Sequence, residues 1–339
     1  MSKTYKIGIV GATGAVGQEA VRLLASRNFP VAELRLFASA RSAGKTLPFR
    51  DLEIPLRPLN AENLQGLDFV IFSAGASRSR EFAPIAVAAG AVVIDNSSAY
   101  RMDPTVPLVV PEINPGDLQN HQGIIANPNC TAAILGTALW PLHQAAGIER
   151  IVVSTYQSAS GAGAQAMAEL ESQVKEYAAG APVAGLGRSV FPHQIAFNVF
   201  SHNTAVGADG SNEEETKVRE ELRKMFHLPE LPVCVTCIRV PVLRAHSESI
   251  VIETREKLSA EEARAILSKA PGVRVVDNRE ANHFPMPLEA SGELDILVGR
   301  IREDVSHPRS LALFVSGDQL LKGAAWNAVQ IAEALIAAG

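Results

Sequence analysis

Short apolar runs alternate with helical patterns over the first third of the chain. Strand-like runs fall at residues 6–10, 34–38, 69–73, 91–95 and 123–126, and helical patterns at 17–26, 82–89 and 131–144. Strands that alternate with helices are typical of a parallel sheet whose two faces are both covered. The pattern therefore predicts an α/β domain of the Rossmann type over residues 1–130.

The rhythm changes after residue 150. Strand-like stretches at 151–157, 233–240, 249–253, 296–301 and 310–315 dominate, with helical patterns at 164–177, 213–225 and 260–268. This order predicts a second, α+β domain over residues 131–317, built on a mostly antiparallel or mixed sheet. Residues 185–212 contain several glycines and few periodic apolar positions, so we expect loops there. Residues 318–339 read as an amphipathic C-terminal helix with Asp318 as its N-cap.

Composition narrows the function classes. The chain has 339 residues, 47% of them hydrophobic, and a net charge of −5. That length allows two domains with cores of their own, and the acidic balance argues against a nucleic-acid partner. The start of the chain lacks the apolar region of a secretory signal, and the longest apolar tract, 82–94, is too short to span a bilayer. We expect a cytoplasmic protein with no membrane partner.

Three cysteines suggest reduced thiols rather than a disulfide framework. Cys234 and Cys237 have the spacing of half a zinc site, but no second Cys or His pair stands at zinc spacing. They also lie in a strand-like segment, where side chains three positions apart point to opposite faces. We therefore expect both to be buried core thiols and expect no metal.

A glycine-rich turn follows the first strand. Gly11, Gly14 and Gly17 let the backbone approach a pyrophosphate at the start of a helix, although such a turn can also be purely structural. After the second strand, Ser39, Arg41 and Ser42 stand where an NAD site would have an acidic residue. Hydroxyls and a guanidinium suit a 2′-phosphate, so NADP is the expected cofactor; the alternative is a solvated polar turn.

Cys130 has unusual surroundings for a packing residue. It follows Asn127-Pro128-Asn129 at the start of an apolar helix, where free N–H groups and the helix dipole favour a thiolate. A nucleotide-binding domain with an activated thiol suggests aldehyde oxidation through a thioester. His246, at the exit of a strand, is the candidate base, and His193, which follows Pro192 in the loop-rich tract, is less easily dismissed as solvated than the other histidines. The remaining histidines are expected to be solvated: His121, His143, His202, His227, His283 and His307.

These residues together resemble the aspartate-semialdehyde dehydrogenase family, nearly end to end. The matching motifs are GATGAVG at 11–17, SARSAG at 39–44, SAG at 73–75, DNSS at 95–98, NPNC at 127–130, YQSASG at 156–161, the block from Arg239 to Glu248, and LLKGAA at 320–325. The resemblance implies reversible, NADPH-dependent conversion of 4-phospho-L-aspartate to L-aspartate 4-semialdehyde and phosphate. That reaction serves lysine, threonine, methionine and diaminopimelate synthesis.

The resemblance also assigns roles residue by residue. Cys130 resembles the acyl-thioester nucleophile, His246 the general acid/base and Gln157 the residue that orients the substrate. Arg239 resembles the partner of the substrate α-carboxylate, and Glu214 the partner of its ammonium group, with Glu213 and Glu215 as open alternatives. Arg101 and Lys217 resemble the phosphate-binding pair, and Asn129 a phosphate-side contact.

For the cofactor, the resemblance implies a pyrophosphate turn over Gly11, Thr13, Gly14, Ala15 and Val16. It implies a 2′-phosphate site at Ser39, Arg41 and Ser42, and a nicotinamide side at Ser160, Gly161 and Gln319. The C-terminal helix would then return to the first domain, and the chain would form a homodimer. The alternatives are an N-acetyl-γ-glutamyl-phosphate reductase, which needs no carboxylate for a free ammonium, and a non-catalytic NADP-binding paralogue.

Overall fold

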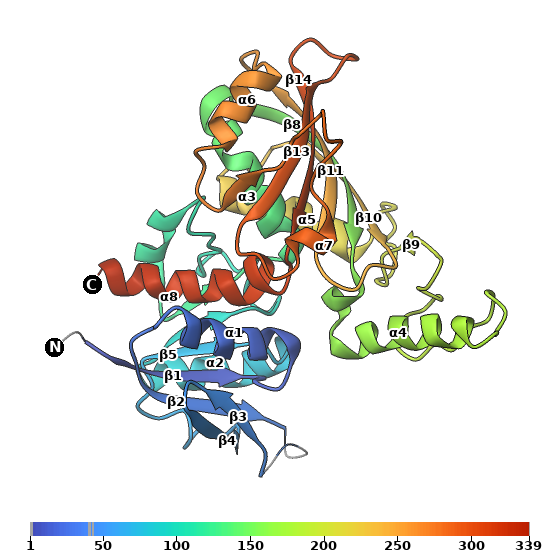
Figure 1. Ribbon diagram of the computed structural model, residues 1–339. Coiled ribbons are helices and arrows are strands. Elements are labelled where there is room, and N and C mark those ends of the chain that lie inside the picture. Colours follow the sequence, from blue (N-terminus) through green and yellow to red (C-terminus); the bar gives the residue numbers. More distant parts are fainter. Residues whose placement is uncertain (1–2, 40–41, 43, 339) are drawn as a thin grey trace. The chain divides into compact units, whose positions relative to one another are not determined.

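The computed structural model describes residues 3–39, 42 and 44–338 (Figure 1). The chain divides into two compact units, one of Met1–Asn129 with Ala324–Gly339 and one of Cys130–Gly323. Among the described residues, no helix is both long and apolar enough to cross a bilayer.

The first unit is built on a seven-stranded sheet. Across the sheet, the strands run β3 (Thr46–Phe49), β4 (Leu52–Pro58), β2 (Val31–Ala38), β1 (Tyr5–Val10), β5 (Phe69–Phe72), β6 (Val92–Asp95) and β7 (Ile124–Ala126). Every pair is parallel except β3 with β4. The antiparallel β3–β4 hairpin was not predicted. Its strands contain prolines, which weaken a strand pattern but are tolerated towards the edge of a sheet.

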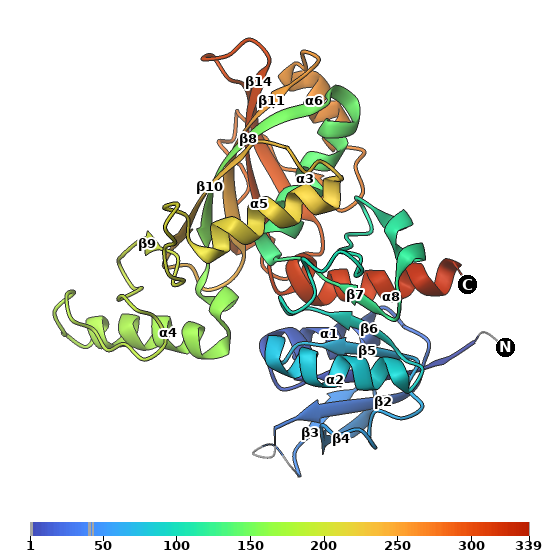
Figure 2. The same ribbon diagram turned by 180° about the vertical axis from the view of Figure 1, so that it is seen from behind.

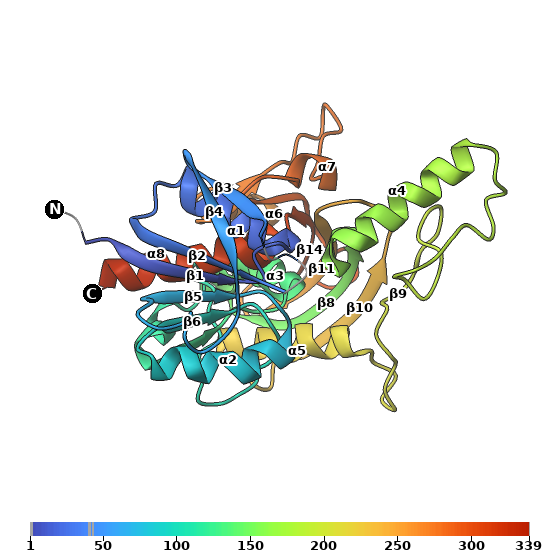
Figure 3. The same cartoon turned by 90° about the horizontal axis from the view of Figure 1, so that it is seen from below.

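Helices cover both faces of this sheet, which confirms the expected α/β class. The helix α1 (Ala15–Ser26) leads from β1 to β2, and α2 (Ala76–Ala88) leads from β5 to β6 on the other side of β1. Right-handed crossovers in opposite directions place these helices on opposite faces (Figure 3). The C-terminal helix α8 (Trp326–Ala338) packs beside α1, and a 3₁₀ helix, η2, covers Pro115–Asn120.

The second unit contains the predicted mixed sheet. Its strands run in the order β12 (Val273–Val275), β13 (Ile296–Glu303), β14 (Ser310–Gly317), β11 (His246–Thr254), β8 (Ile148–Gln157), β10 (Val233–Arg239) and β9 (Phe200–Ser201). The β8–β10 and β12–β13 pairs are parallel and the others antiparallel.

Three helices of the second unit pack on one face of this sheet: α3 (Cys130–Ala146), α5 (Glu213–Phe226) and α6 (Ala260–Leu267) (Figure 2). The helix α3 is apolar almost all round because it lies between the sheet and the other two helices. The helix α4 (Ala164–Ala178) and the loops after it form an arm beyond β10, with a small core around Leu170 and Phe191. The short helices of this unit are η3 (Ala159–Ala162) and α7 (Pro287–Ala290), and the π-helical turn η4 (Leu321–Ala325) crosses the boundary at which the unit ends.

The C-terminal helix begins later than predicted. We expected it to start after Asp318, but α8 starts at Trp326, behind the turn η4. Residues 318–323 belong to the second unit instead, because Asp318 and Gln319 are bonded there. The carboxylate of Asp318 accepts from Arg244 Nε and from the amide of Gly292, both at 2.7 Å. Asp318 therefore fixes a loop and does not cap the helix.

Candidate active site

Three neighbouring strands of the second unit bring polar side chains to one edge of the sheet. The parallel strands β8 and β10 end at Gln157 and Arg239, which are register partners. The strand β11 runs antiparallel to β8 and begins at His246, so it starts where the other two end. All three side chains are buried. The sheet thus brings Gln157 together with Arg239 and His246, which follow it in the chain by more than 80 positions.

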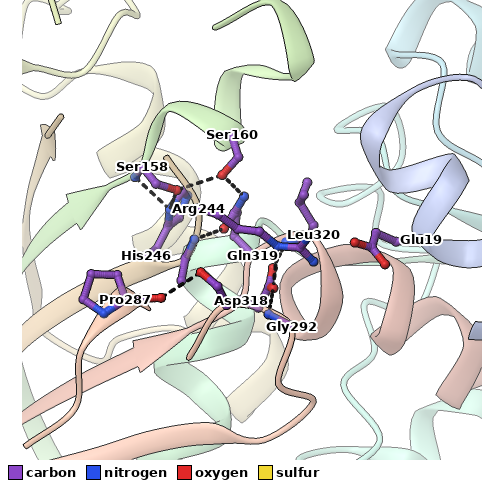
Figure 4. Close-up of polar contacts among 12 residues, drawn as sticks. Glu19, Ser158, Ser160, Arg244, His246, Pro287, Gly292, Asp318, Gln319 and Leu320 are labelled. Carbon is purple, nitrogen blue, oxygen red and sulfur yellow. Dashed lines mark hydrogen bonds and ion pairs between the residues drawn. The ribbon is translucent and has the colours of Figure 1, made fainter. Parts of the chain in front are cut away.

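His246 is held at one ring nitrogen only. Its Nδ1 accepts a hydrogen bond from the backbone N–H of Ser158 at 3.0 Å and lies 3.0 Å from the Ser158 hydroxyl (Figure 4). Its Nε2 is buried and has no partner among the described residues. Because Nδ1 is an acceptor, the neutral ring carries its hydrogen on Nε2. Burial, with Arg239 and His202 nearby, holds the pKa of His246 well below its usual value, so the ring is neutral at pH 7.

A short polar chain continues from Ser158. The Ser158 and Ser160 hydroxyls are 3.0 Å apart, and Gln319 Nε2 donates to the Ser160 hydroxyl (Figure 4). The Oε1 of Gln319 accepts from the amide of Ala245 at 2.9 Å. Gly161 lies against the free side of the imidazole, where an added Cβ would come within 2.9 Å of His246 Nε2.

Arg239 is a buried cation whose contacts are all neutral. Its Nη1 donates to the Ser158 carbonyl at 2.6 Å, and its Nη2 lies 2.7 Å from His202 Nε2 and 2.9 Å from Asn203 Oδ1. Its Nε is buried and has no partner in the described part of the chain. Burial lowers the pKa of Arg239. The negative charges of Glu214 and of a Cys130 thiolate act in the opposite direction and raise it.

Glu214, on the first turn of α5, is joined to Gln157. The carboxamide of Gln157 donates from Nε2 to Glu214 Oε1 at 3.1 Å, and its Oε1 accepts from the Thr155 hydroxyl at 3.2 Å. The neighbouring carboxylates are occupied elsewhere. Glu213 pairs with Lys217 at 2.6 Å, and Glu215 forms a capping box and accepts from the amide of Cys237. Of the three glutamates, Glu214 is therefore the one at Gln157.

Cys130 is the first residue of α3, so its sulfur lies at the positive end of the helix dipole. The thiol is half-buried, and its backbone packs closely on Gly323, where an added Cβ would lie 2.6 Å from Cys130 Cβ. Cys130 belongs to the same compact unit as Gln157, Arg239 and His246. Lys217 lies one turn after Glu214 on α5 and is one of the charges acting on His202.

The first unit has a cavity of about 440 Å³ at the glycine-rich turn. Gly11 has a positive φ of 84°, and an added Cβ would lie 2.5 Å from the Ser73 carbonyl oxygen, so only glycine fits. Gly14 precedes α1, which opens with Ala15 and Val16. The cavity is lined by Gly11, Thr13, Ser39 and Arg78 together with Val10, Phe37, Ala38, Pro58, Leu59, Ala74 and Phe82.

The expected 2′-phosphate residues are only partly described. Ser42 is half-buried and its amide donates to the Ser39 carbonyl, whereas Arg41 lies outside the described residues. Arg101 and Asn129 also belong to the first unit. Arg101 is buried and donates to the carbonyls of Asn127 and Asn96 at 2.9 and 2.8 Å. Asn129 is buried directly before Cys130.

Sequence reasoning missed two residues at these sites. His202 was expected to be solvated, but it is half-buried beside Arg239. Arg78 was missed because we expected the helix to start at residue 82. It starts at Ala76, and the polar run Ser77-Arg78-Ser79-Arg80 hides the helical pattern of its first turns. The spacing of Phe82 and Arg78, four residues apart on one helical face, was the available signal.

The two remaining cysteines differ from each other. Cys237 is buried as expected, and burial raises the pKa of its thiol. The expectation that Cys234 is buried was wrong, because it lies on the opposite face of β10 from Cys237 and is exposed. No cluster of three or more His, Cys, Asp or Glu side chains that could hold a metal is found in the described ranges.

Comparisons with known proteins agree over the whole chain. The family model "Semialdehyde dehydrogenase, NAD binding domain" matches residues 6–121, and "Semialdehyde dehydrogenase, dimerisation domain" matches residues 139–322. An aspartate-semialdehyde dehydrogenase of a Synechocystis strain is 52% identical over 340 residues, which cover 100% of this chain and 99% of that protein.

Solved structures give the same result. The crystal structure of aspartate semialdehyde dehydrogenase II from Vibrio cholerae complexed with ASA has a TM-score of 0.94 and 40% identity, with 99% of both chains covered. The enzyme from Candida albicans, solved with NADP, has a TM-score of 0.76 and 26% identity, with 98% of both chains covered.

Proposed function

Because this chain belongs to the aspartate-semialdehyde dehydrogenase family and has that family's activity, we propose that it works with NADP through a thioester on Cys130. In the biosynthetic direction, the thiolate attacks the acyl carbon of 4-phospho-L-aspartate and phosphate leaves. Bound NADPH supplies the hydride that reduces the thioester. Collapse of the resulting thiohemiacetal releases the semialdehyde and regenerates the Cys130 thiolate.

His246 handles the proton of the reacting carbonyl oxygen. Its Nε2–H is the one free polar group on the buried ring, since Nδ1 is held by Ser158. The negative charge that develops on the carbonyl oxygen during hydride addition is met by this donor. The proton passes to the oxygen and returns to Nε2 when the C–S bond breaks. The same two transfers, reversed, serve oxidation of the semialdehyde.

Arg239 and Glu214 suit the two charges of an amino acid. The unpartnered, buried Nε of Arg239 is a donor that a substrate carboxylate would satisfy, and burial of that donor without an acceptor costs free energy. Glu214, placed by Gln157, supplies the carboxylate for the substrate ammonium. The family resemblance gives the phosphate group to Lys217 and Arg101, with Asn129 beside them.

The cavity of the first unit fits the adenosine end of NADP. Its glycine turn leaves room for a pyrophosphate at the start of α1. No acidic residue follows β2, where an NAD site would use one for the ribose 2′-hydroxyl. Ser39 and Arg78 line the cavity instead, and Arg41 and Ser42 follow Ser39 in the sequence. Ser160, Gly161 and Gln319 would serve the nicotinamide side.

We also propose a homodimer formed through the second unit. Tyr156 is exposed on β8, and the arm formed by α4 and the loops after it exposes Tyr177, Phe197 and Val199. The rings of Tyr177 and Phe197 are in contact, and large apolar side chains that are exposed together favour a protein partner. Tyr177→Asp should shift the sedimentation coefficient of the chain towards that of a monomer, and an unchanged coefficient would place the contact elsewhere.

The observation that carries the mechanism is the assembly of Cys130, Gln157, Arg239 and His246 within one unit. The test is NADP+ reduction by L-aspartate semialdehyde, with phosphate present or absent. Cys130→Ala should abolish turnover and keep NADP binding, whereas Cys234→Ala, at an exposed thiol, should keep both. Turnover by the Cys130 variant at the original rate would exclude the thioester. Turnover restricted to N-acetyl-glutamate semialdehyde would contradict the assigned substrate.

A further inference from the structure

His202 is fixed by its backbone and its ring. Its amide donates to the carbonyl of Cys237 on β10 at 3.1 Å, directly after β9 pairs with that strand. Its ring nitrogen Nε2 lies 2.7 Å from Arg239 Nη2, and Nδ1 lies 3.3 Å from the Thr204 hydroxyl. His202, directly after β9, therefore lies with its ring against the guanidinium of Arg239.

The guanidinium of Arg239 determines which ring nitrogen of His202 carries the hydrogen. A guanidinium only donates, so Nε2 of His202 must be the acceptor and the ring hydrogen must be on Nδ1. The ring is therefore neutral, with Nδ1–H directed at Thr204. The pKa of His202 is lowered to about 4, mainly by burial; Glu214 opposes this shift, Arg239 and Lys217 contribute to it, and Glu213 opposes it.

Neutral acceptors leave the charge of Arg239 available. The acceptors are the Ser158 carbonyl, His202 Nε2 and Asn203 Oδ1, and in the described part of the chain none of them is a carboxylate. A carboxylate in the place of His202 would hold the guanidinium equally well but would neutralise it. A neutral imidazole fixes the orientation of the cation and keeps its attraction for an anion.

We propose that His202 is a positioning residue that presents Arg239, whose hydrogen-bond acceptors are all neutral, to the α-carboxylate of the substrate. The inference rests on the proposed function, in which Arg239 pairs with that carboxylate. It assigns substrate selectivity to a residue of the loop after β9 as well as to the strands of the sheet.

Three replacements of His202 separate its roles. His202→Gln keeps an uncharged acceptor, His202→Leu removes the acceptor at similar size, and His202→Glu supplies a charged one. We expect KM for L-aspartate semialdehyde to rise about 3-fold or less for Gln, about 10- to 100-fold for Leu, and at least as much for Glu. The value of kcat should change less than KM in each case, because His202 acts on substrate binding.

His193→Leu is the matched control. It makes the same chemical change in the same loop region, but His193 is exposed and contacts the ring of Phe200 rather than Arg239. It should leave KM within about 3-fold of the original, since surface substitutions of this kind cost little. The thermal unfolding midpoint of each variant shows whether it is folded, and KM for NADP+ should not change in any of them.

A substrate without the carboxylate isolates the effect. 3-Aminopropanal has the aldehyde and the ammonium group of L-aspartate semialdehyde and lacks only the carboxylate. The preference in kcat/KM for the semialdehyde over 3-aminopropanal should fall in His202→Leu and His202→Glu and be kept in His202→Gln. If Leu and Gln lose the preference equally, or if Leu and Glu keep it, the inference is overturned.

Arg239→Leu separates this inference from the proposed function. If Arg239→Leu also keeps the preference for the semialdehyde, the assignment of Arg239 to the carboxylate is wrong, and the proposed function needs correction at that point. If Arg239→Leu loses the preference and His202→Leu keeps it, only the role of His202 is wrong.

Discussion

The backbone N–H of Ser158 donates to Nδ1 of His246 at 3.0 Å, and this bond determines which ring nitrogen carries the proton. A backbone amide cannot accept, so the neutral imidazole must be protonated on Nε2, the nitrogen without a partner among the described residues. The amide at the end of β8 thereby prepares a proton donor on the neighbouring strand.

His246→Asn should lower kcat by about 10²- to 10⁴-fold, the usual contribution of a positioned acid or base, with a small change in KM. Ser158→Ala should keep most of the activity, because it removes the hydroxyl and retains the amide that fixes the tautomer. Steady-state kinetics of the two variants test both statements. Equal losses would show that the hydroxyl, not the amide, is required.

Gly161→Ala should lower kcat because the new methyl group would lie 2.9 Å from His246 Nε2 and 3.2 Å from Arg239 Nη1. Gly161 has no positive φ, so alanine strains the contact and not the backbone. Gly187→Ala is the control, since its Cβ would meet only the Glu176 carboxylate at 3.4 Å. Comparable kcat values for the two variants would contradict the close approach of Gly161 to the imidazole.

Arg78→Ala should weaken NADP binding by about 10-fold or more and NAD binding much less, because a charge-assisted bond to a 2′-phosphate is lost. Arg78 lines the cavity, and its exposed pair with Glu81 does little to hold it elsewhere. Arg80→Ala removes the same charge from the same helix outside the cavity. Dissociation constants from calorimetry give the comparison; equal losses for NADP and NAD would show that Arg78 does not contact the phosphate.

Glu248→Gln should stabilise the protein more at pH 7 than at pH 5. The carboxyl is fully buried and neither oxygen has a partner among the described residues, so burial raises its pKa well above the usual value. Above about pH 4.5 the unfolded chain loses this proton and the folded chain keeps it, so native stability falls by up to about 1.4 kcal/mol per pH unit.

Urea unfolding at both pH values measures this gain, with Glu256→Gln at an exposed site as the control. A gain for Glu248→Gln that is the same at pH 5 and pH 7 would mean that Glu248 is ionised in the folded protein.

The alternation of apolar and polar positions was enough to predict both sheets and most helices, because strands buried on two faces and helices on one face leave distinct periods. Neighbouring residues in the chain were enough to predict that the glycine turn leads into a helix and that Cys130 lies at a helix start. The resemblance of its motifs to those of a known family identified the family. The hairpin β3–β4, the early start of α2 and the late start of α8 were missed, because prolines, a polar first turn and the contacts of Asp318 override local pattern.

The tertiary structure alone decided how the site residues meet. Which of three consecutive glutamates faces Gln157, which nitrogen of His246 is protonated, and why His202 lies at Arg239 all depend on groups far apart in the sequence. A loop histidine and a solvated histidine have the same local pattern, and only the pairing of β9 with β10 brings His202 to the guanidinium. The sequence determined which chemical groups the protein has, and the register of its strands determined which of them act together.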